Sequence, residues 1–172
     1  MNLLFTLSPP EIETLTAALS CARKPGTPDP LLRALDELAQ LRVGHRLFTA
    51  LRYDLAAGMA HRLYSSAPQI YAANGSKRIV DAPALHRMVT SGQPMLTADA
   101  DAVRKNFPDA DAIFSLNCES VLNIPVYGRG QLLGQINLLH ASDYYSPAHI
   151  KFCEGLAIIA APAFIACDPS HA

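Results

Sequence analysis

The chain has 172 residues, of which 50% are apolar and 17% are charged, and its formal net charge is −1. This composition is typical of one globular domain with enough apolar side chains for a core, and it excludes an intrinsically disordered chain. The sequence contains no run of lysine or arginine, so we expect neither nucleic acid nor a membrane as a partner.

Cysteine and histidine spacing indicates neither a metal site nor a disulfide framework. No cysteines form a CxxC pair, and no histidines have i,i+4 or HxH spacing. We expect free thiols in a reducing cytoplasm, no metal and no cofactor. The N-terminus lacks the positive region of a signal peptide, and Pro162 interrupts the most apolar segment, which is shorter than a membrane span of about 20 residues. The sequence therefore predicts a soluble, cytoplasmic protein. Its cysteines are Cys21, Cys118, Cys153 and Cys167.

Two helices are predicted at the start of the chain. Ser8 and Glu11 form the capping box of the first helix, and the proline-rich stretch KPGTPDP follows it as a linker. A second helix is expected from Asp29 to about Leu41. We expect residues 1–28 to form an N-terminal helix and linker, and residues 29–168 to form the main domain. The apolar stripe of the first helix consists of Ile12, Leu15 and Leu19.

Strands and short helices alternate in the middle of the chain. Residues 45–66 read as two strands with a turn at 56–58, and Asn74-Gly75 marks a turn-rich stretch after them. Lys77-Arg78 is predicted to be an exposed loop. The later segments are a helix over 83–91 that Gly92 ends, a strand over 93–99, a helix over 100–107 and a loop or strand over 111–116. One face of the first strand consists of Leu47, Thr49, Leu51 and Tyr53.

A long hairpin and a helix end the chain. The stretch SVLNIPVYGRGQLLGQINLLH, residues 120–140, reads as two apolar strands joined by a glycine-flanked turn. Ser146 and Pro147 begin a helix that runs to about Ala166 and is expected to kink near Pro162. Short connections between most strands, with helices at both ends of the chain, predict an α+β fold with an antiparallel sheet.

The second half of the chain resembles the C-terminal half of a GAF domain. An apolar strand ending in proline, a glycine turn, a second apolar strand and an aromatic-rich loop into the last helix follow the pattern of that family. The resemblance covers roughly Asp29 to Ala166. PAS-like domains are the class most easily confused with GAF domains on this pattern. The matching residues are Leu122, Ile124, Pro125, Gly128, Gly130, Leu133, Gly134, Ile136, Leu138, Tyr145, Ser146 and Phe152.

This resemblance implies a sheet of about six antiparallel strands with the terminal helices on one face. A small-molecule pocket would occupy the other face, and the protein would act as a sensory or regulatory module. Because the chain stops at Ala172, we expect a free-standing GAF-like protein. The last helix is apolar nearly all round, which predicts burial on two sides, one against the sheet and the other in a homodimer or under the N-terminal helix.

Signatures of the ligand-specific GAF subfamilies are not evident. The residue set of the cyclic-nucleotide-binding members does not fit the chain, and no cysteine is followed by the histidine typical of bilin attachment. The free methionine-(R)-sulfoxide reductases use several cysteines around the pocket. Here only Cys118 is expected near the pocket, and the companion cysteines are missing. Two roles of Cys118 are left open, a catalytic nucleophile and an inert buried thiol, and we favour the inert thiol.

Three amides in the hairpin are the main candidates for ligand contacts. Alternation places Asn123 on one face of its strand, and Gln135 with Asn137 on one face of the next. A three-residue loop at Gly128-Arg129-Gly130 would place Asn123 opposite Gln135. Either the amides bond to each other in a core, or they form the polar floor of a pocket.

The helix around His86 and the segment Phe107–Cys118 are expected to roof this pocket. Arg87 is a candidate for binding a carboxylate or phosphate, with a solvated helix face as the alternative. The predicted ligand-binding residues are Asn123, Gln135, Asn137, Cys118, Ser120, His86, Arg87, Tyr53, Tyr71, Phe107 and Phe114. A non-catalytic regulatory protein is the first hypothesis; a cysteine-dependent redox enzyme and an interaction module with a collapsed pocket are the alternatives.

Overall fold

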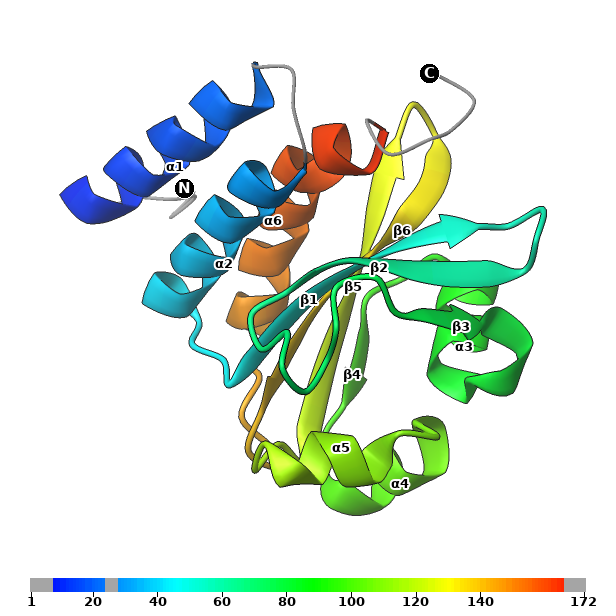
Figure 1. The fold of residues 1–172 in the computed structure, drawn as a ribbon. Helices are drawn as coiled ribbons and strands as arrows, with labels where there is room; N and C mark the ends of the chain where they lie inside the picture. The colour runs from blue at the N-terminus through cyan, green and yellow to red at the C-terminus, as the bar shows by residue number, and fades with distance from the viewer. Residues whose placement is uncertain (1–7, 24–27, 166–172) are drawn as a thin grey trace.

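An antiparallel sheet of six strands is the centre of the fold (Figure 1). The computed structural model describes residues 8–23 and 28–165. The strand order is β3-β2-β1-β6-β5-β4, so the long hairpin predicted from the sequence lies in the middle of the sheet. The predicted α+β class and the six-stranded antiparallel sheet are confirmed. The strands are β1 (Leu47–Asp54), β2 (Met59–Ser65), β3 (Ser76–Arg78), β4 (Met95–Thr97), β5 (Ser120–Gly128) and β6 (Gln131–His140).

The helices divide between the two faces of the sheet. Figure 1 shows α1, α2 and α6 on one face and α3, α4 and α5 on the other side. The predicted capping box is present in α1, because Glu11 accepts hydrogen bonds from the backbone and hydroxyl of Ser8, both at 2.7 Å. The helices are α1 (Pro9–Ala22), α2 (Asp29–Arg42), α3 (Pro83–Ser91), α4 (Ala100–Asn106), α5 (Ala110–Ser115) and α6 (Pro147–Ile165), and a 3-10 turn spans Ile79–Asp81.

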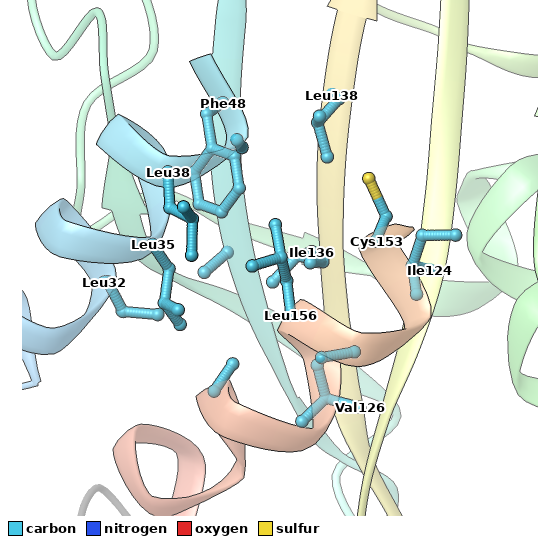
Figure 2. Close-up of a cluster of buried hydrophobic side chains, with 14 of the residues drawn as sticks. Leu32, Leu35, Leu38, Phe48, Ile124, Val126, Ile136, Leu138, Cys153 and Leu156 are labelled. Carbon is cyan, nitrogen blue, oxygen red and sulfur yellow. The ribbon is translucent and has the colours of Figure 1, made fainter. Parts of the chain in front are cut away.

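The face under the terminal helices is a continuous apolar core (Figure 2). α6 packs against β5, β6 and α2, so one face of it is buried inside the domain, while Ile158 and Ile165 are exposed. By length and composition alone α6 would also suit a membrane span, and its packing in the core accounts for the apolar residues of its buried face. The core side chains labelled in Figure 2 are Leu32, Leu35, Leu38, Phe48, Ile124, Val126, Ile136, Leu138, Cys153 and Leu156.

The predicted hairpin register is wrong by two residues. The loop between β5 and β6 has two residues, Arg129 and Gly130, both with positive φ, and a bulge follows where Val126 meets Gly134. Asn123 therefore lies opposite Asn137 rather than Gln135. A shift of two residues leaves every side chain on its predicted face, because the period of a strand is two.

Two local predictions are wrong for reasons outside the segments themselves. Residues 111–116, predicted as loop or strand, lie largely in the helix α5. Lys77-Arg78, predicted as an exposed loop, forms the short edge strand β3, where Lys77 pairs with Ala60 of β2. Both segments take their structure from packing against neighbours that are distant in the sequence, which propensity does not report.

Candidate functional site

A small cavity lies on the sheet face opposite the terminal helices. Its volume is about 50 Å³, counted as the space open to the centre of a water-sized sphere. The walls come from β1, β2, β3, β5 and β6, from the start of α3 and from the loop between α4 and α5. The lining residues are Leu47, Thr49, Leu51, Arg62, Tyr71, Lys77, Ala82, Ala84, Leu85, Phe107, Pro108, Asp109, Ile113, Val121, Asn123, Gln135, Asn137 and Leu139.

Three amides and a threonine form a bonded floor for this cavity. Asn123 donates from Nδ2 to Oδ1 of Asn137 at 2.7 Å, and Gln135 donates from Nε2 to the same oxygen. Asn137 in turn donates from Nδ2 to Oγ1 of Thr49 at 2.9 Å. Tyr53 donates its hydroxyl hydrogen to Oε1 of Gln135. The amides thus bond to each other and also line the cavity, so both alternatives left open by the sequence hold.

One acceptor in this floor has no partner. Oδ1 of Asn123 is buried and makes no hydrogen bond to the part of the chain that the structure describes. The residue as a whole is only 1% exposed. An unpaired buried amide oxygen costs roughly 1–3 kcal/mol, so it is a place where a ligand N–H or O–H would be bound favourably.

An ion pair stands in the cavity wall above the floor. Nζ of Lys77 lies 2.5 Å from Oδ2 of Asp109, and the hydroxyl of Tyr71 donates to the same oxygen at 3.0 Å. Burial acts to raise the pKa of Asp109, but the charge of Lys77 and the two hydrogen bonds outweigh it and leave that pKa lowered. The other oxygen, Oδ1, is buried with no partner among the described residues. The carboxylate therefore has one side engaged and one side available.

A bulge in β2 brings a second cation to the cavity. Ala50 pairs with Tyr64 but Leu51 pairs with Arg62, so Leu63 is the extra residue. In a regular strand Tyr64 and Arg62 would share a face. Here Tyr64 packs on the helix side, with its hydroxyl 2.7 Å from Oδ2 of Asp36, while Arg62 lines the cavity. The bulge thus turns the guanidinium toward the candidate site.

Five of the predicted site residues line the cavity, and a sixth contacts its floor. The five come from three parts of the chain, which the sheet and the α4–α5 loop bring together. Tyr53 does not line the cavity, but its hydroxyl bonds to Gln135. The residues in the lining are Tyr71, Phe107, Asn123, Gln135 and Asn137.

The structure places the other predicted site residues away from the cavity. His86 and Arg87 lie on the exposed side of α3, where Arg87 borders a separate hollow beside β4, while Ala84 and Leu85 face the cavity instead. The helix was predicted correctly, but the side of it that faces the cavity was not.

Three further predicted site residues pack elsewhere. Phe114 is half-buried under the guanidinium of Arg104, whose carbon lies 4.9 Å from the ring centroid. Ser120 is buried and donates to the backbone oxygen of Ala141 at 2.7 Å. Cys118 is buried in an apolar cluster beside the cavity, with Sγ 3.6 Å from the Leu116 carbonyl oxygen. None of the three lines the cavity.

The buried thiols are poorly suited to nucleophilic chemistry. Burial raises the pKa of Cys118 to about 11, against a smaller opposing effect of Arg46. Burial also raises the pKa of Cys153, in α6, to about 12. A thiol needs a lowered pKa to react as a thiolate near neutral pH. Cys167 lies outside the described residues, within which no cluster of three or more potential metal ligands occurs.

Sequence reasoning missed the three charged residues of the cavity. Lys77 was taken for a loop residue, Asp109 follows Pro108 without any recognisable motif, and Arg62 reaches the cavity only because of the bulge. Among these, the alternation Ser76-Lys77-Arg78 was the one available signal, since it gives Lys77 a different face from its neighbours.

Searches by sequence give no relative: no family model matches the chain, and no curated protein does. Comparison with solved structures gives many. The GAF domain of a phosphoenolpyruvate-protein phosphotransferase from Coxiella burnetii superposes with a TM-score of 0.72 at 13% identity, covering 90% of this chain and 92% of that one. The fold is GAF-like.

Two other structures with the GAF-like fold have different functions. The free methionine-R-sulfoxide reductase from Neisseria meningitidis, solved with its substrate, has a TM-score of 0.67 and 14% identity, with 96% of each chain covered. The chromophore-binding domain of a Stigmatella aurantiaca bacteriophytochrome has a TM-score of 0.64 and 14% identity, covering 93% of this chain and 61% of that one. At such identities the GAF-like fold is shared, and function has to be argued from the site.

Proposed function

We propose that the protein is a non-catalytic sensory or regulatory GAF-like protein that binds a small molecule in the cavity. The observation that carries this proposal is the unpaired Oδ1 of Asn123 in a floor of otherwise bonded amides. Purely structural polar clusters satisfy their own members, whereas this one leaves an acceptor beside an open space. Binding sites are mostly apolar with a few polar groups that orient the ligand, and the lining has this composition.

Substituting Asn123 by leucine tests the proposal, because it removes the free acceptor and fills space above the floor. Metabolites that co-purify with the wild-type protein from cells would be identified by mass spectrometry and tested for a shift in Tm. We expect at least one to stabilise the wild type and to have no effect on Asn123→Leu. Gln131→Leu is the matched control, because Gln131 is an exposed amide of the same hairpin outside the cavity. If no metabolite stabilises the wild type, the interaction-module alternative is favoured instead.

A cysteine-dependent redox enzyme is the second candidate. The observation behind it is Cys118 in the apolar cluster beside the cavity, in a fold that is also that of the free methionine-R-sulfoxide reductase. The buried state and raised pKa of Cys118 favour the non-catalytic proposal. Titration with a thiol reagent at neutral pH distinguishes the two. We expect slow modification of Cys118 in the folded protein, and fast modification that disappears in Cys118→Ser would contradict the non-catalytic proposal.

We also propose that the protein forms a homodimer through its terminal helices. Ile12 and Leu19 of α1 are 51% and 44% exposed, and Ile158 of α6 is 76% exposed. Ile12 and Leu19 are seven residues apart, so they lie on the same side of α1. Light scattering on Ile158→Glu should show a monomer, while Leu55→Glu, at an exposed apolar position of the β1–β2 turn, should keep the wild-type mass. A wild type that is monomeric at high concentration would contradict the homodimer. The cytoplasmic location stays a prediction.

A further inference from the structure

Arg62 places a positive charge in the cavity wall and forms no ion pair among the described residues, although the charge of Asp109 acts on it. Its Nη1 donates to the backbone oxygen of Ala72 at 2.8 Å, and its guanidinium carbon lies 4.9 Å from the ring centroid of Tyr71. Its Nε is buried and has no hydrogen-bond partner among the described residues. Asp109, a carboxylate in the cavity lining, is already bound by Lys77 and Tyr71. The ion pairs of the described residues are Arg42–Glu11, His45–Asp36, Lys77–Asp109, Arg78–Asp81 and Arg104–Asp101.

The charges of the cavity therefore do not balance. Arg62 and Lys77 supply two positive charges and Asp109 one negative charge, and the amide floor is neutral. Arg62 is half-buried, and a partly desolvated charge is stabilised by a partner of opposite sign, because desolvation without one is costly. Burial lowers the pKa of Arg62, although Tyr71 and Asp109 partly oppose this. The missing partner is an anion, and the unpaired Nε is a donor available to it.

We propose that the ligand is a small carboxylate that also carries a hydrogen-bond donor, with its carboxylate on Arg62 and its donor on the free oxygen of Asn123. This inference rests on the proposed function, since it names the ligand class of the same cavity. Two buried acceptors without partners, Oδ1 of Asn123 and Oδ1 of Asp109, require the donor. The planar guanidinium of arginine matches a carboxylate, which it binds through charge-assisted hydrogen bonds.

Cavity size favours a compact carboxylate over a nucleotide or a sugar phosphate. One water-sized group needs about 10–15 Å³ of such space, so about 50 Å³ admits roughly four groups of that size. The sequence suggested Arg87 for binding an anion. The structure leaves Arg87 exposed on α3 and puts Arg62 in the wall, so the role passes to Arg62.

Nitrogen-15 NMR on the full chain tests this inference at the atom concerned. The Nε–Hε resonance of Arg62 is assigned by its loss in Arg62→Gln, and the probes are glycolate and lactate. Each is compared with its neutral primary amide, which keeps the donor and removes the charge. Propionate is the counterpart of lactate without the hydroxyl group, and inorganic phosphate is the alternative anion. Arg87→Gln is the matched control, because it removes an arginine that lies outside the cavity.

We expect at least one of the carboxylates to move the Arg62 resonance in the wild type and in Arg87→Gln. Its neutral amide should bind about tenfold to a hundredfold more weakly, the usual contribution of a hydrogen bond to a charged group. In the two Arg62 variants, which lack this resonance, binding is followed by the side-chain Nδ2 resonances of Asn123. Arg62→Gln should lose binding to the same extent, and Arg62→Lys, which keeps the charge but not the planar donors, should recover part of it. If lactate is the carboxylate that binds, propionate should bind several-fold more weakly than lactate.

Three results would overturn the inference, and each is distinguishable from failure of the proposed function. Equal binding of the amides would show that the cavity takes a neutral ligand, and the proposed function would stand. Binding of phosphate without any carboxylate would show a different anion. No movement of the Arg62 resonance with any carboxylate would remove this ligand class, while metabolites that co-purify with the protein would still decide whether the cavity binds a small molecule.

Discussion

The two faces of the sheet differ most clearly at one point of the β5–β6 hairpin. Ile124 pairs with Ile136 on the face under the terminal helices, and the adjacent pair, Asn123 with Asn137, faces the cavity. All four residues are at most 4% exposed. The same backbone pairing thus supports an aliphatic, filled face and a polar, hollow one.

This difference separates stability from function within one hairpin. Burying an isoleucine side chain stabilises the fold by about 1.5–3 kcal/mol, whereas a buried amide contributes only while its hydrogen bonds are made. The helix-covered face follows the rule that cores are apolar and densely packed. The cavity face departs from that rule at the amide floor, and such departures are expected at functional sites.

Truncation on the two faces should give the largest contrast in stability. Ile136→Ala removes a fully buried side chain from the filled face, so we expect a loss of about 2–5 kcal/mol in the free energy of unfolding. Leu51→Ala should cost about 2 kcal/mol, at the low end of this range, because Leu51 already borders the cavity and has fewer atoms around it. Urea unfolding measures both, and equal losses would show that the cavity is closed in solution.

Within the polar face, the two paired asparagines should behave differently. Asn137 accepts from Asn123 and Gln135 and donates to Thr49, so Asn137→Leu leaves several buried groups unpaired and should cost about 2–4 kcal/mol. Asn123→Leu removes one hydrogen bond together with an unpaired oxygen, so its cost should stay near 1 kcal/mol. A larger loss for Asn123→Leu than for Asn137→Leu, measured by urea unfolding, would contradict the network.

The polar floor was accessible from the sequence because it depends only on alternation. The predicted loop was one residue too long and the bulge near Val126 was missed, yet Asn123 and Gln135 were assigned to the face that lines the cavity. The two errors together shifted the pairing by two residues, and a strand tolerates that shift without changing faces. The fold class was predicted from the short connections between strands and the helices at both ends of the chain, which are also local features of the sequence.

The charged wall was not accessible from the sequence because it depends on contacts between distant segments. Lys77 and Asp109 are 32 residues apart, and they meet because β3 pairs at the sheet edge next to the α4–α5 loop. Arg62 faces the cavity because of a bulge in β2, and no residue of β2 indicates that bulge in the sequence. His86 was misplaced because a nine-residue helix gives too few turns to fix its rotation from pattern alone.

The charged wall should contribute less to stability than the filled face does, and its contribution should depend on pH. The lowered pKa of Asp109 means that its contribution is complete above its ordinary value of 3.8 and is lost as the pH falls through the lower, folded value. Asp109→Asn should therefore cost about 1–2 kcal/mol near pH 7, because Lys77 loses its partner in a partly buried site. Toward pH 3 the difference between wild type and variant should shrink.

Asp101→Asn is the matched control for this measurement. Asp101 also pairs with a cation, Arg104, but the aspartate side chain is 96% exposed, so the substitution should change stability by less than about 0.5 kcal/mol at any pH. A difference between Asp109→Asn and wild type that stays constant from neutral to acidic pH would mean that Asp109 contributes through packing alone. In that case the charged wall would resemble the helix-covered face, where shape decides stability, and the contrast between the two faces would be confined to the amide floor.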